Sequence, residues 1–352
     1  SIMVGTGKGA ENGILIKDAQ SLERAEKVTA IVFDKTGTLT EGKPVVTDIR
    51  GDEPQVLALA YSLEKNSEHS LAEAIIHKAK ELNISASNIE NFQAVSGRGI
   101  LGRVDGRLIL LGNRAMMDEN GIDLKEFGGQ MEQLQLEGKT MMALAVGQEI
   151  VGLIAVSDKP KANAPGAIAE LKKMGIQVLM ITGDNQNTAQ AIAKQVGVDQ
   201  VIANVLPQDK EKKIRELQSQ NNIVAMVGDG INDAPALAAA DLGIAMGTGT
   251  DVAIEAAGIT LMNTDLGSVV TAIKLSKATM RNIKENLGWA FGYNVALIPV
   301  AAGVLFPFFG ILLNPILAGG AMAFSSVSVV LNALRLRGFR PPRMSHGTGR
   351  MS

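Results

Sequence analysis

The sequence predicts an α/β protein built on a doubly wound parallel sheet. Apolar, strand-like runs recur at 28–33, 175–181 and 222–227, each ends in a small polar cluster, and helical stretches lie between them. This order favours right-handed βαβ units, in which the carboxyl ends of parallel strands meet at one edge of the sheet. The three polar clusters are therefore expected to surround one pocket.

The first cluster contains the candidate nucleophile. Asp34 directly follows the first run and opens the string Asp34-Lys-Thr-Gly-Thr-Leu-Thr40. A carboxylate at a strand end can attack a phosphoryl group and form an aspartyl-phosphate, whereas an isolated Asp at such a place usually only caps a turn. Gly37 suits a tight turn that approaches phosphate. The complete string resembles the phosphorylation motif of P-type ATPases, ion pumps that cycle through an aspartyl-phosphate.

The other clusters supply the remaining parts of a phosphoryl-transfer site. Such a site requires a nucleophile, Mg²⁺ and donors that neutralise the moving oxygens. Thr182-Gly183-Asp184 follows the second run, Gly228-Asp229 opens a cluster after the third, and Lys210 lies in Pro-Gln-Asp-Lys. Lys210 taken alone would be an ordinary surface lysine. In order, these motifs resemble the haloacid-dehalogenase-like core of P-type ATPases.

This resemblance implies specific roles for residues of the four motifs. The implied catalytic residues are Asp34, Lys35, Thr36, Thr182, Gly183, Asp184, Lys210, Asn232 and Asp233, and the implied Mg²⁺ ligands are Asp34, Thr36 and Asp229. Soluble phosphatases of the superfamily usually carry a second Asp two positions after the nucleophile, where this chain has Thr36. Without that proton acceptor, attack by water should be slow and the phosphoenzyme should persist, which suits a pump.

A long charge-free run predicts a C-terminal transmembrane hairpin. From Leu287 to Leu334, 48 residues include no Asp, Glu, Lys or Arg. One membrane crossing takes about 20 apolar residues, so the run suits two helices joined by a turn near 307–315. Basic residues flank both ends, so both flanks are expected in the cytoplasm. A buried helical pair in a soluble protein is the alternative.

Polar residues within this run indicate a possible ion site. Tyr293 and Asn294 lie in the first predicted helix, and Met322, Ser325 and Ser326 lie in the second. A thioether suits monovalent copper, although a single methionine more often packs or faces lipid. The combination resembles the membrane signature of copper-exporting P-type ATPases, which implies a Cu⁺ site of Tyr293, Asn294, Met322 and Ser326. The Lys and Asp-x-Gly expected of zinc and cadmium members are missing from these places.

The segment 43–157 has a different texture and is expected to be an inserted α+β domain. Helical patterns at 55–64 and 71–81 precede short strands, and Asp105-Gly106 is a two-residue hairpin signal. In the family such an insertion binds the nucleotide, which implies ATP-binding roles for Glu64, His69, Gly97, Gly99 and Asn113. Ser70 stands where the family usually has a Pro.

Composition excludes other classes. With a net charge of −2, an isoelectric point near 6.0 and no cysteine, the chain shows no nucleic-acid signal and no disulfide or thiolate metal site. The predicted organisation is a stalk and first part of the phosphorylation domain (1–42), a nucleotide-binding domain (43–157), the rest of the phosphorylation domain (158–270), a stalk with two membrane helices (271–340) and a tail (341–352).

The resemblance implies ATP-driven Cu⁺ export across a membrane. It covers only the C-terminal half of such a pump, so we expect this chain to be a truncated pump that lacks the upstream half and does not transport in isolation. The implied cofactors are ATP and Mg²⁺, and the implied partners are membrane lipid, the copper ion and a copper chaperone. The expected location is the plasma membrane, multi-pass, with the nucleotide and phosphorylation domains in the cytoplasm. A soluble phosphohydrolase of the dehalogenase superfamily and an idle nucleotide-binding fragment are the alternatives.

Overall fold

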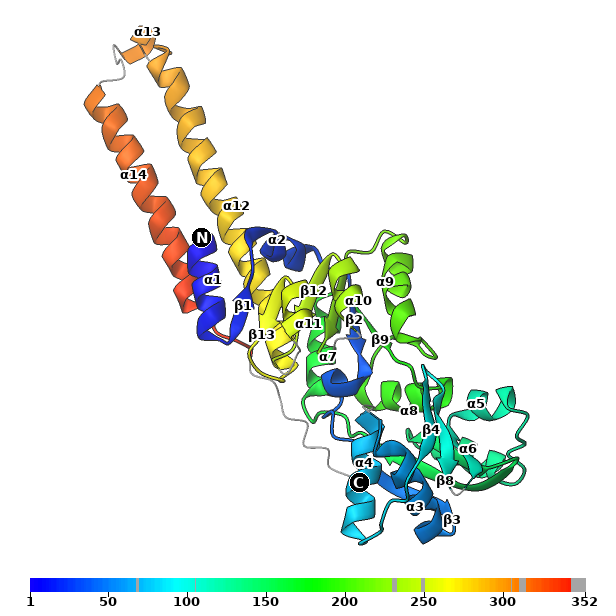
Figure 1. Ribbon diagram of the computed structural model, residues 1–352. Coiled ribbons are helices and arrows are strands. Elements are labelled where there is room, and N and C mark those ends of the chain that lie inside the picture. The colour runs from blue at the N-terminus through cyan, green and yellow to red at the C-terminus, as the bar shows by residue number, and fades with distance from the viewer. Residues whose placement is uncertain are drawn as a thin grey trace, which may run out of the picture.

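The computed structural model describes residues 1–67, 70–104, 106–229, 233–247, 251–304, 306–309 and 315–342. Two sheets, a set of covering helices and a projecting helical pair make up this part of the chain (Figure 1). The predictions for His69, Asp105 and Asn232 lie outside the described residues.

The larger sheet has seven strands in the order β1-β13-β12-β11-β2-β9-β10. All neighbouring pairs are parallel except β1 with β13 at one edge. The three predicted strands are confirmed and occupy its centre. The strands are β1 (Ile14–Ile16), β2 (Ala30–Asp34), β9 (Gln177–Ile181), β10 (Gln200–Ile202), β11 (Val224–Gly228), β12 (Leu242–Ala245) and β13 (Ile259–Leu261).

Both faces of this sheet are covered, as a doubly wound fold requires. Ile31 and Phe33 of β2 belong to one apolar core, and the alternate residues Ala30 and Val32 belong to another. Successive strand residues point to opposite faces, so an apolar run without alternation is what a strand buried on both sides needs. The first core includes side chains of α2 (Ala19–Lys27), α7 (Ala164–Lys173), α8 (Gln186–Val196) and α12 (Gly267–Ala301), and the second includes side chains of α9 (Lys210–Gln218), α10 (Ala234–Ala239) and α11 (Asp251–Ala256).

The second sheet lies within the predicted insertion and is antiparallel throughout. Its order is β3-β8-β7-β6-β5-β4, and α3 with α4 covers one face while α5 with α6 covers the other. The predicted hairpin is present, since Val104 of β5 pairs with Arg107 of β6. The elements are β3 (Val45–Gly51), α3 (Glu53–Glu64), α4 (Ser70–Glu81), β4 (Glu90–Val95), β5 (Gly99–Val104), β6 (Arg107–Gly112), α5 (Arg114–Glu119), α6 (Phe127–Leu136), β7 (Thr140–Val146) and β8 (Glu149–Ser157).

Two adjacent chain crossings join the sheets. Thr40 forms an isolated antiparallel bridge with Pro160, and the Glu41 amide donates to the Lys159 carbonyl at 2.9 Å. The Thr40 hydroxyl donates to Asp158 Oδ2 at 2.5 Å. The two predicted linkers therefore run side by side and are fixed to each other.

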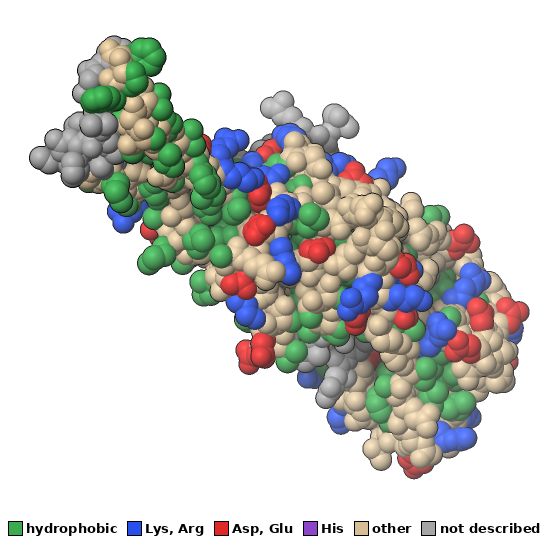
Figure 2. Space-filling model, turned by 90° about the horizontal axis from the view of Figure 1, so that it is seen from above, with side chains coloured by type: hydrophobic (Ala, Val, Ile, Leu, Met, Phe, Trp, Pro, Cys, Tyr) green, Lys and Arg blue, Asp and Glu red, His purple; other side chains and the backbone are tan. Residues whose placement is uncertain are grey.

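The C-terminal part forms an antiparallel helical pair that projects from the larger sheet (Figure 1). The helix α12 is continuous for 35 residues, and α14 (Pro315–Leu334) returns beside it after the short α13 (Phe306–Phe309). Hydrophobic side chains gather along this pair (Figure 2). Among the described residues, none of the helices combines the length and the apolar character needed to span a bilayer.

Buried amides join the base of the pair to α1 (Ile2–Glu11) and its flank. Asn282 of α12 accepts from the Ser1 hydroxyl at 2.7 Å and donates to the Asn332 carbonyl of α14 at 2.8 Å. Asn332 in turn donates to Asn286 Oδ1 at 2.9 Å. Because buried amides are costly to leave unpaired, this network fixes the register of the two long helices.

Candidate functional site

Asp34 lies at the centre of the larger sheet, where its strand ends. The strand β2 runs between β11 and β9, and Asp34 is in register with Ile181. Thr182 therefore follows on the neighbouring strand, and Asp229 directly follows Gly228, the last residue of β11. Because β2 is parallel to both β9 and β11, the three polar clusters meet at one edge of the sheet, as predicted.

A buried ion triad surrounds the candidate nucleophile. Lys210 Nζ lies 2.7 Å from Asp34 Oδ1 and 2.6 Å from Asp233 Oδ1. All three residues are buried: Asp34 is 6% exposed, Lys210 8% and Asp233 2%. Lys210 begins α9 and Asp233 immediately precedes α10, so two helices on one face of the sheet deliver side chains to the end of β2.

The electrostatics of the triad follow from its burial. Burial raises the pKa of Asp34 to about 7, with Lys210 opposing the rise and Asp233 adding to it. Burial by itself would lower the pKa of Lys210, but the charges of Asp34 and Asp233 outweigh burial and raise this pKa above its usual value. Lys210 is therefore a permanent cation beside Asp34.

A third carboxylate completes an oxygen cluster. One ligand atom from each of Asp34, Asp229 and Asp233 lies within 4.8 Å of the others. Burial, followed by the charge of Asp233, raises the pKa of Asp229 to about 6. Carboxylate oxygens are the ligands that Mg²⁺ prefers, and a cation among three crowded carboxylates would relieve their repulsion, so the donor set fits Mg²⁺. The Thr36 side chain makes no hydrogen bond among the described residues.

Gly37 shapes the turn that follows Asp34. Its φ is +72°, and a Cβ at this position would lie 2.1 Å from Asp229 Oδ2. The Gly37 carbonyl accepts a 2.8 Å hydrogen bond from Lys161 Nζ, and Lys161 is buried. Lys161 was not predicted as a site residue, because neither its type nor its spacing in the sequence marks a buried lysine.

A second ion pair lies on the other side of the same turn. Lys35 Nζ pairs with Asp184 Oδ2, and both side chains are nearly buried. Burial would raise the pKa of Asp184, but Lys35, with hydrogen bonds from Thr140 and Thr182, holds this pKa below its usual value. Thr182 Oγ1 lies 3.2 Å from Asp184 Oδ2, whereas the neighbouring Gly183 is exposed.

Three of the predicted nucleotide residues lie in one region of the second sheet. Asn113 Nδ2 donates to the Gly97 carbonyl at 2.9 Å. Gly99 has φ +153°, and a Cβ there would lie 2.2 Å from the Leu111 carbonyl oxygen. A Cβ at Gly97 would lie 2.3 Å from Leu206 Cδ2, so this glycine turn abuts the loop that leads to Lys210.

Glu64, the last residue of α3, is a buried acid. It is 3% exposed, and its Oε2 has no hydrogen-bond partner among the described residues. Burial raises the pKa of Glu64 to about 7, against a smaller lowering by a hydrogen bond from Ser67. The Oε2 atom, which has no hydrogen-bond partner among the described residues, can exchange hydrogen bonds with a ligand.

Among the described residues, the four predicted copper residues make no hydrogen bond from one helix of the pair to the other. Asn294 Nδ2 donates to the Ala290 carbonyl, and Ser326 Oγ donates to the Met322 carbonyl, each within its own helix. Met322 is 70% exposed. The copper site therefore stays a prediction.

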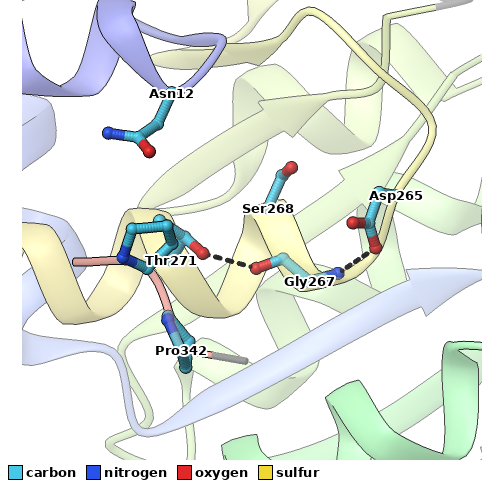
Figure 3. A pocket seen from close by; sticks show the side chains of 7 residues that line it. Asn12, Asp265, Gly267, Ser268, Thr271 and Pro342 are labelled. Carbon is cyan, nitrogen blue, oxygen red and sulfur yellow. Dashed lines mark hydrogen bonds between the residues drawn. The ribbon is translucent and has the colours of Figure 1, made fainter. Parts of the chain in front are cut away.

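A separate cavity of about 330 Å³ lies where α1 ends and α12 begins (Figure 3). Asp265 accepts from the Gly267 amide at 2.8 Å, and Thr271 Oγ1 donates to the Gly267 carbonyl at 2.8 Å. The residues Asp34, Asp229 and Asp233, which we call the Asp34 cluster, do not line this cavity. Its polar groups close the first turn of a helix and contribute nothing to the candidate site.

A family model describes the part of the chain that carries this geometry. The model for haloacid dehalogenase-like hydrolases matches residues 28–241. The chain belongs to this family. The match includes β2, β9 and β11, and it includes every residue of the Asp34 cluster.

Curated relatives of this chain are named as copper-transporting ATPases. It is 55% identical to a probable copper-transporting ATPase PacS of Synechocystis sp., with 97% of this chain and 47% of the relative covered. The chain is also 54% identical to a copper-exporting P-type ATPase of Staphylococcus saprophyticus, and the match covers 96% of this chain and 41% of the relative. The chain thus spans less than half the length of these two relatives.

Solved structures agree on the fold. A zinc-transporting PIB-type ATPase in the E2.Pi state matches with a TM-score of 0.69 and 37% identity, and the match covers 95% of this chain and 54% of that one. The catalytic domain CopB-B of a CPx-ATPase matches with a TM-score of 0.62 and 31% identity, and the match covers 77% of this chain and 98% of that one.

Gly37→Ala is expected to lower the free energy of unfolding by roughly 2 to 4 kcal/mol, because it adds backbone strain and a collision with Asp229. Gly175→Ala is the matched control, since Gly175 has φ +76° but open space around its Cβ position. Its expected cost is about 1 kcal/mol. Calorimetric unfolding of both variants provides the measurement, and equal shifts would contradict a role for the Asp229 contact.

Glu64→Gln is expected to flatten the pH dependence of α3 stability. Folding raises the pKa of Glu64 from 4.5 to about 7, so the stabilising contribution is complete below pH 4.5 and is lost as the pH rises through about 7. The difference between these two pKa values corresponds to about 3 kcal/mol of folding free energy. Hydrogen exchange of α3, corrected for intrinsic rates, should show the variant to be more stable than wild type at pH 8.

The matched control is Glu53→Gln, since Glu53 is exposed at the first turn of the same helix. It should follow the wild-type pH profile. Parallel profiles for Glu64→Gln and wild type would show that Glu64 does not titrate between these values.

Proposed function

We propose that this chain is the phosphorylation and nucleotide-binding part of a Cu⁺-exporting P-type ATPase, and that Asp34 is its phosphorylated residue. The observation that carries the proposal is the buried Asp34–Lys210–Asp233 triad beside Asp229 at the end of β2. A buried carboxylate held next to a permanent cation, at the ligand-binding edge of a parallel sheet, suits phosphoryl transfer.

In the proposed step, an oxygen of Asp34 forms a bond to the γ-phosphorus of ATP. The bond from that phosphorus to the bridging oxygen breaks, and its electron pair leaves with ADP. Asp34 must be ionised to attack, and the Lys210 ammonium 2.7 Å away favours the ionised form. The same ammonium lies where it can neutralise oxygens of the transferred group.

Asp34 and Asp229 are the proposed Mg²⁺ ligands, with Thr36 contributing and Asp233 adjacent. When bound there, Mg²⁺ would neutralise charge on the phosphoryl oxygens. Gly37 permits the close approach of Asp229 to the turn, and Lys161 anchors the Gly37 carbonyl. The chain's own contribution is to hold the acceptor carboxylate and its neighbours in place before ATP arrives.

ATP is proposed to bind between the two sheets, with adenosine on the inserted segment. Glu64, His69, Gly97, Gly99 and Asn113 are the proposed contacts. The bond from Asn113 to Gly97 and the contact of that turn with Leu206 favour this placement, because they bring the glycine turn beside the loop that carries Lys210. Thr182, Gly183, Asp184, Asn232 and Lys35 are proposed to complete the phosphate side.

The helical pair is proposed to lie in a membrane, and the pump in the plasma membrane. Support comes from the charge-free run and from large apolar side chains that are exposed along α12 and α14 and at α13 between them: Trp289, Phe291, Val295, Ile298, Phe308, Phe324, Val327, Val330 and Leu331. Tyr293, Asn294, Met322 and Ser326 are proposed to contribute to a Cu⁺ site there. The names of the curated relatives favour copper over zinc. A copper chaperone is the proposed protein partner.

Incubation with Mg²⁺ and ATP labelled at the γ-phosphate is expected to label Asp34 as an acyl phosphate that is stable in acid and labile to hydroxylamine. Asp34→Asn keeps the size of the side chain and removes the nucleophile, so labelling should fall to background, at least about 100-fold. Peptide mapping by mass spectrometry locates the adduct. Labelling of the variant at the wild-type level would refute the assignment.

Met322→Leu, placed in the full-length pump, is expected to reduce copper-stimulated ATP hydrolysis by about tenfold, because it keeps the volume and removes the sulfur ligand. Phe324→Leu on the same helix is the control and should retain copper stimulation. Undiminished stimulation in Met322→Leu, or stimulation of the wild type by Zn²⁺ instead, would exclude the copper assignment and leave the phosphorylation chemistry unaffected.

A further inference from the structure

The inserted sheet reaches into the phosphate side of the site through one hydroxyl. Thr140 opens β7, and its Oγ1 donates a 2.9 Å hydrogen bond to Asp184 Oδ1. Asp184 belongs to the loop that follows β9 of the larger sheet. This contact therefore crosses from one sheet to the other and ends on a residue of the candidate site.

The two oxygens of Asp184 have different partners. Oδ2 pairs with Lys35 Nζ and lies 3.2 Å from Thr182 Oγ1. Among the described residues, the Thr140 hydroxyl is the one hydrogen-bond donor to Oδ1. With only 9% of the Asp184 side chain exposed, water has little access to replace that donor. Thr140 thus sets the rotation of a nearly buried carboxylate.

Asp184 in turn holds the residue next to the nucleophile. The Lys35 side chain is 10% exposed, and the Lys35 carbonyl accepts from the Thr40 amide at 3.1 Å. Both ends of Lys35 are therefore fixed, and its backbone nitrogen is bonded to the Asp34 carbonyl carbon. The orientation of Asp184 therefore helps to set the position of Lys35, the residue next to Asp34 in the chain.

We propose that Thr140 is a positioning residue for phosphoryl transfer to Asp34, acting through Asp184 and Lys35. The inference rests on the proposed function, and it adds a residue of the inserted sheet to the geometry of the phosphate side. In this role, Thr140 would also make the phosphorylation turn sensitive to the placement of the inserted sheet, because the Thr140 hydroxyl belongs to that sheet.

Simple docking of the two sheets is the competing explanation, and the chain provides a matched control for it. Thr188 of α8 donates through Oγ1 to the Lys139 carbonyl at 2.8 Å. That bond joins the same two parts of the chain and involves the residue beside Thr140, but it does not touch Asp184. Thr188→Val removes this docking bond and the hydrogen bond that Thr188 Oγ1 accepts from Asn185 Nδ2 at the start of α8, and it leaves the Asp184 contact in place. Thr140→Val removes docking together with the Asp184 contact.

The experiment measures the initial rate of acyl-phosphate formation on the full 352-residue chain with Mg²⁺. ATP and acetyl phosphate serve as donors, and acetate leaves when the second donor transfers its phosphoryl group. Thr140→Val should slow the maximal rate about tenfold with both donors and leave the half-saturating ATP concentration within about twofold. Thr140→Ser, which keeps the hydroxyl, should restore the rate to within about threefold, and Thr188→Val should remain within about twofold of wild type.

Other results would overturn the inference. Equal losses in Thr140→Val and Thr188→Val would assign Thr140 to docking, as would a loss expressed only as a higher half-saturating ATP concentration. If Thr140→Val does not fold, Thr140→Ala replaces it in the same comparison, and an unchanged rate in either variant excludes the role. Absence of labelling in the wild type would instead refute the proposed function and the inference that rests on it.

Discussion

The buried ammonium of Lys210 between Asp34 and Asp233 is the constraint on which the candidate site depends. Three charges at such low exposure are tolerable only as a set, since removing one partner of a buried ion pair typically costs about 3–5 kcal/mol. The three residues come from the end of β2 and the starts of α9 and α10. The triad therefore fixes two helices against the strand that carries the nucleophile.

Two neighbouring residues of opposite charge hold the phosphorylation turn from both sides. Asp34 pairs with Lys210, while Lys35 pairs with Asp184. The chain then turns through Thr36 and Gly37, which have non-helical backbone angles, and Lys161 binds the Gly37 carbonyl. With a side-chain contact on each side and a backbone contact beyond, the turn has little freedom to move the nucleophile. This rigidity is what pre-organised phosphoryl transfer requires.

The sequence was sufficient for features that depend on local pattern. Continuous apolar runs located β2, β9 and β11, and parallel topology then required their polar ends to meet, which placed Asp34 near Asp229. It was insufficient for contacts that depend on how two distant segments pack. Lys161, Thr140 and the approach of Leu206 to Gly97 belong to this second kind, because neither spacing nor residue type marks them before both sheets are in place. Burial of Glu64 likewise follows from tertiary packing of α3.

The long helix α12 links the two regions that the proposed function joins. Its first turns are part of the core of the larger sheet, where Val269, Val270 and Ile273 are fully buried. At 1.5 Å per residue, its 35 residues extend about 50 Å, and Tyr293 and Asn294 lie in its outer half. The buried amides Asn282 and Asn286, near the middle of α12, bind it to Asn332 of α14. A rotation of the sheet core must therefore move both helices together, because the helix is unbroken between the core and the outer turns and its partner is held in register. Under the proposed function, this pair would connect the sheet core around Asp34 with the proposed ion site.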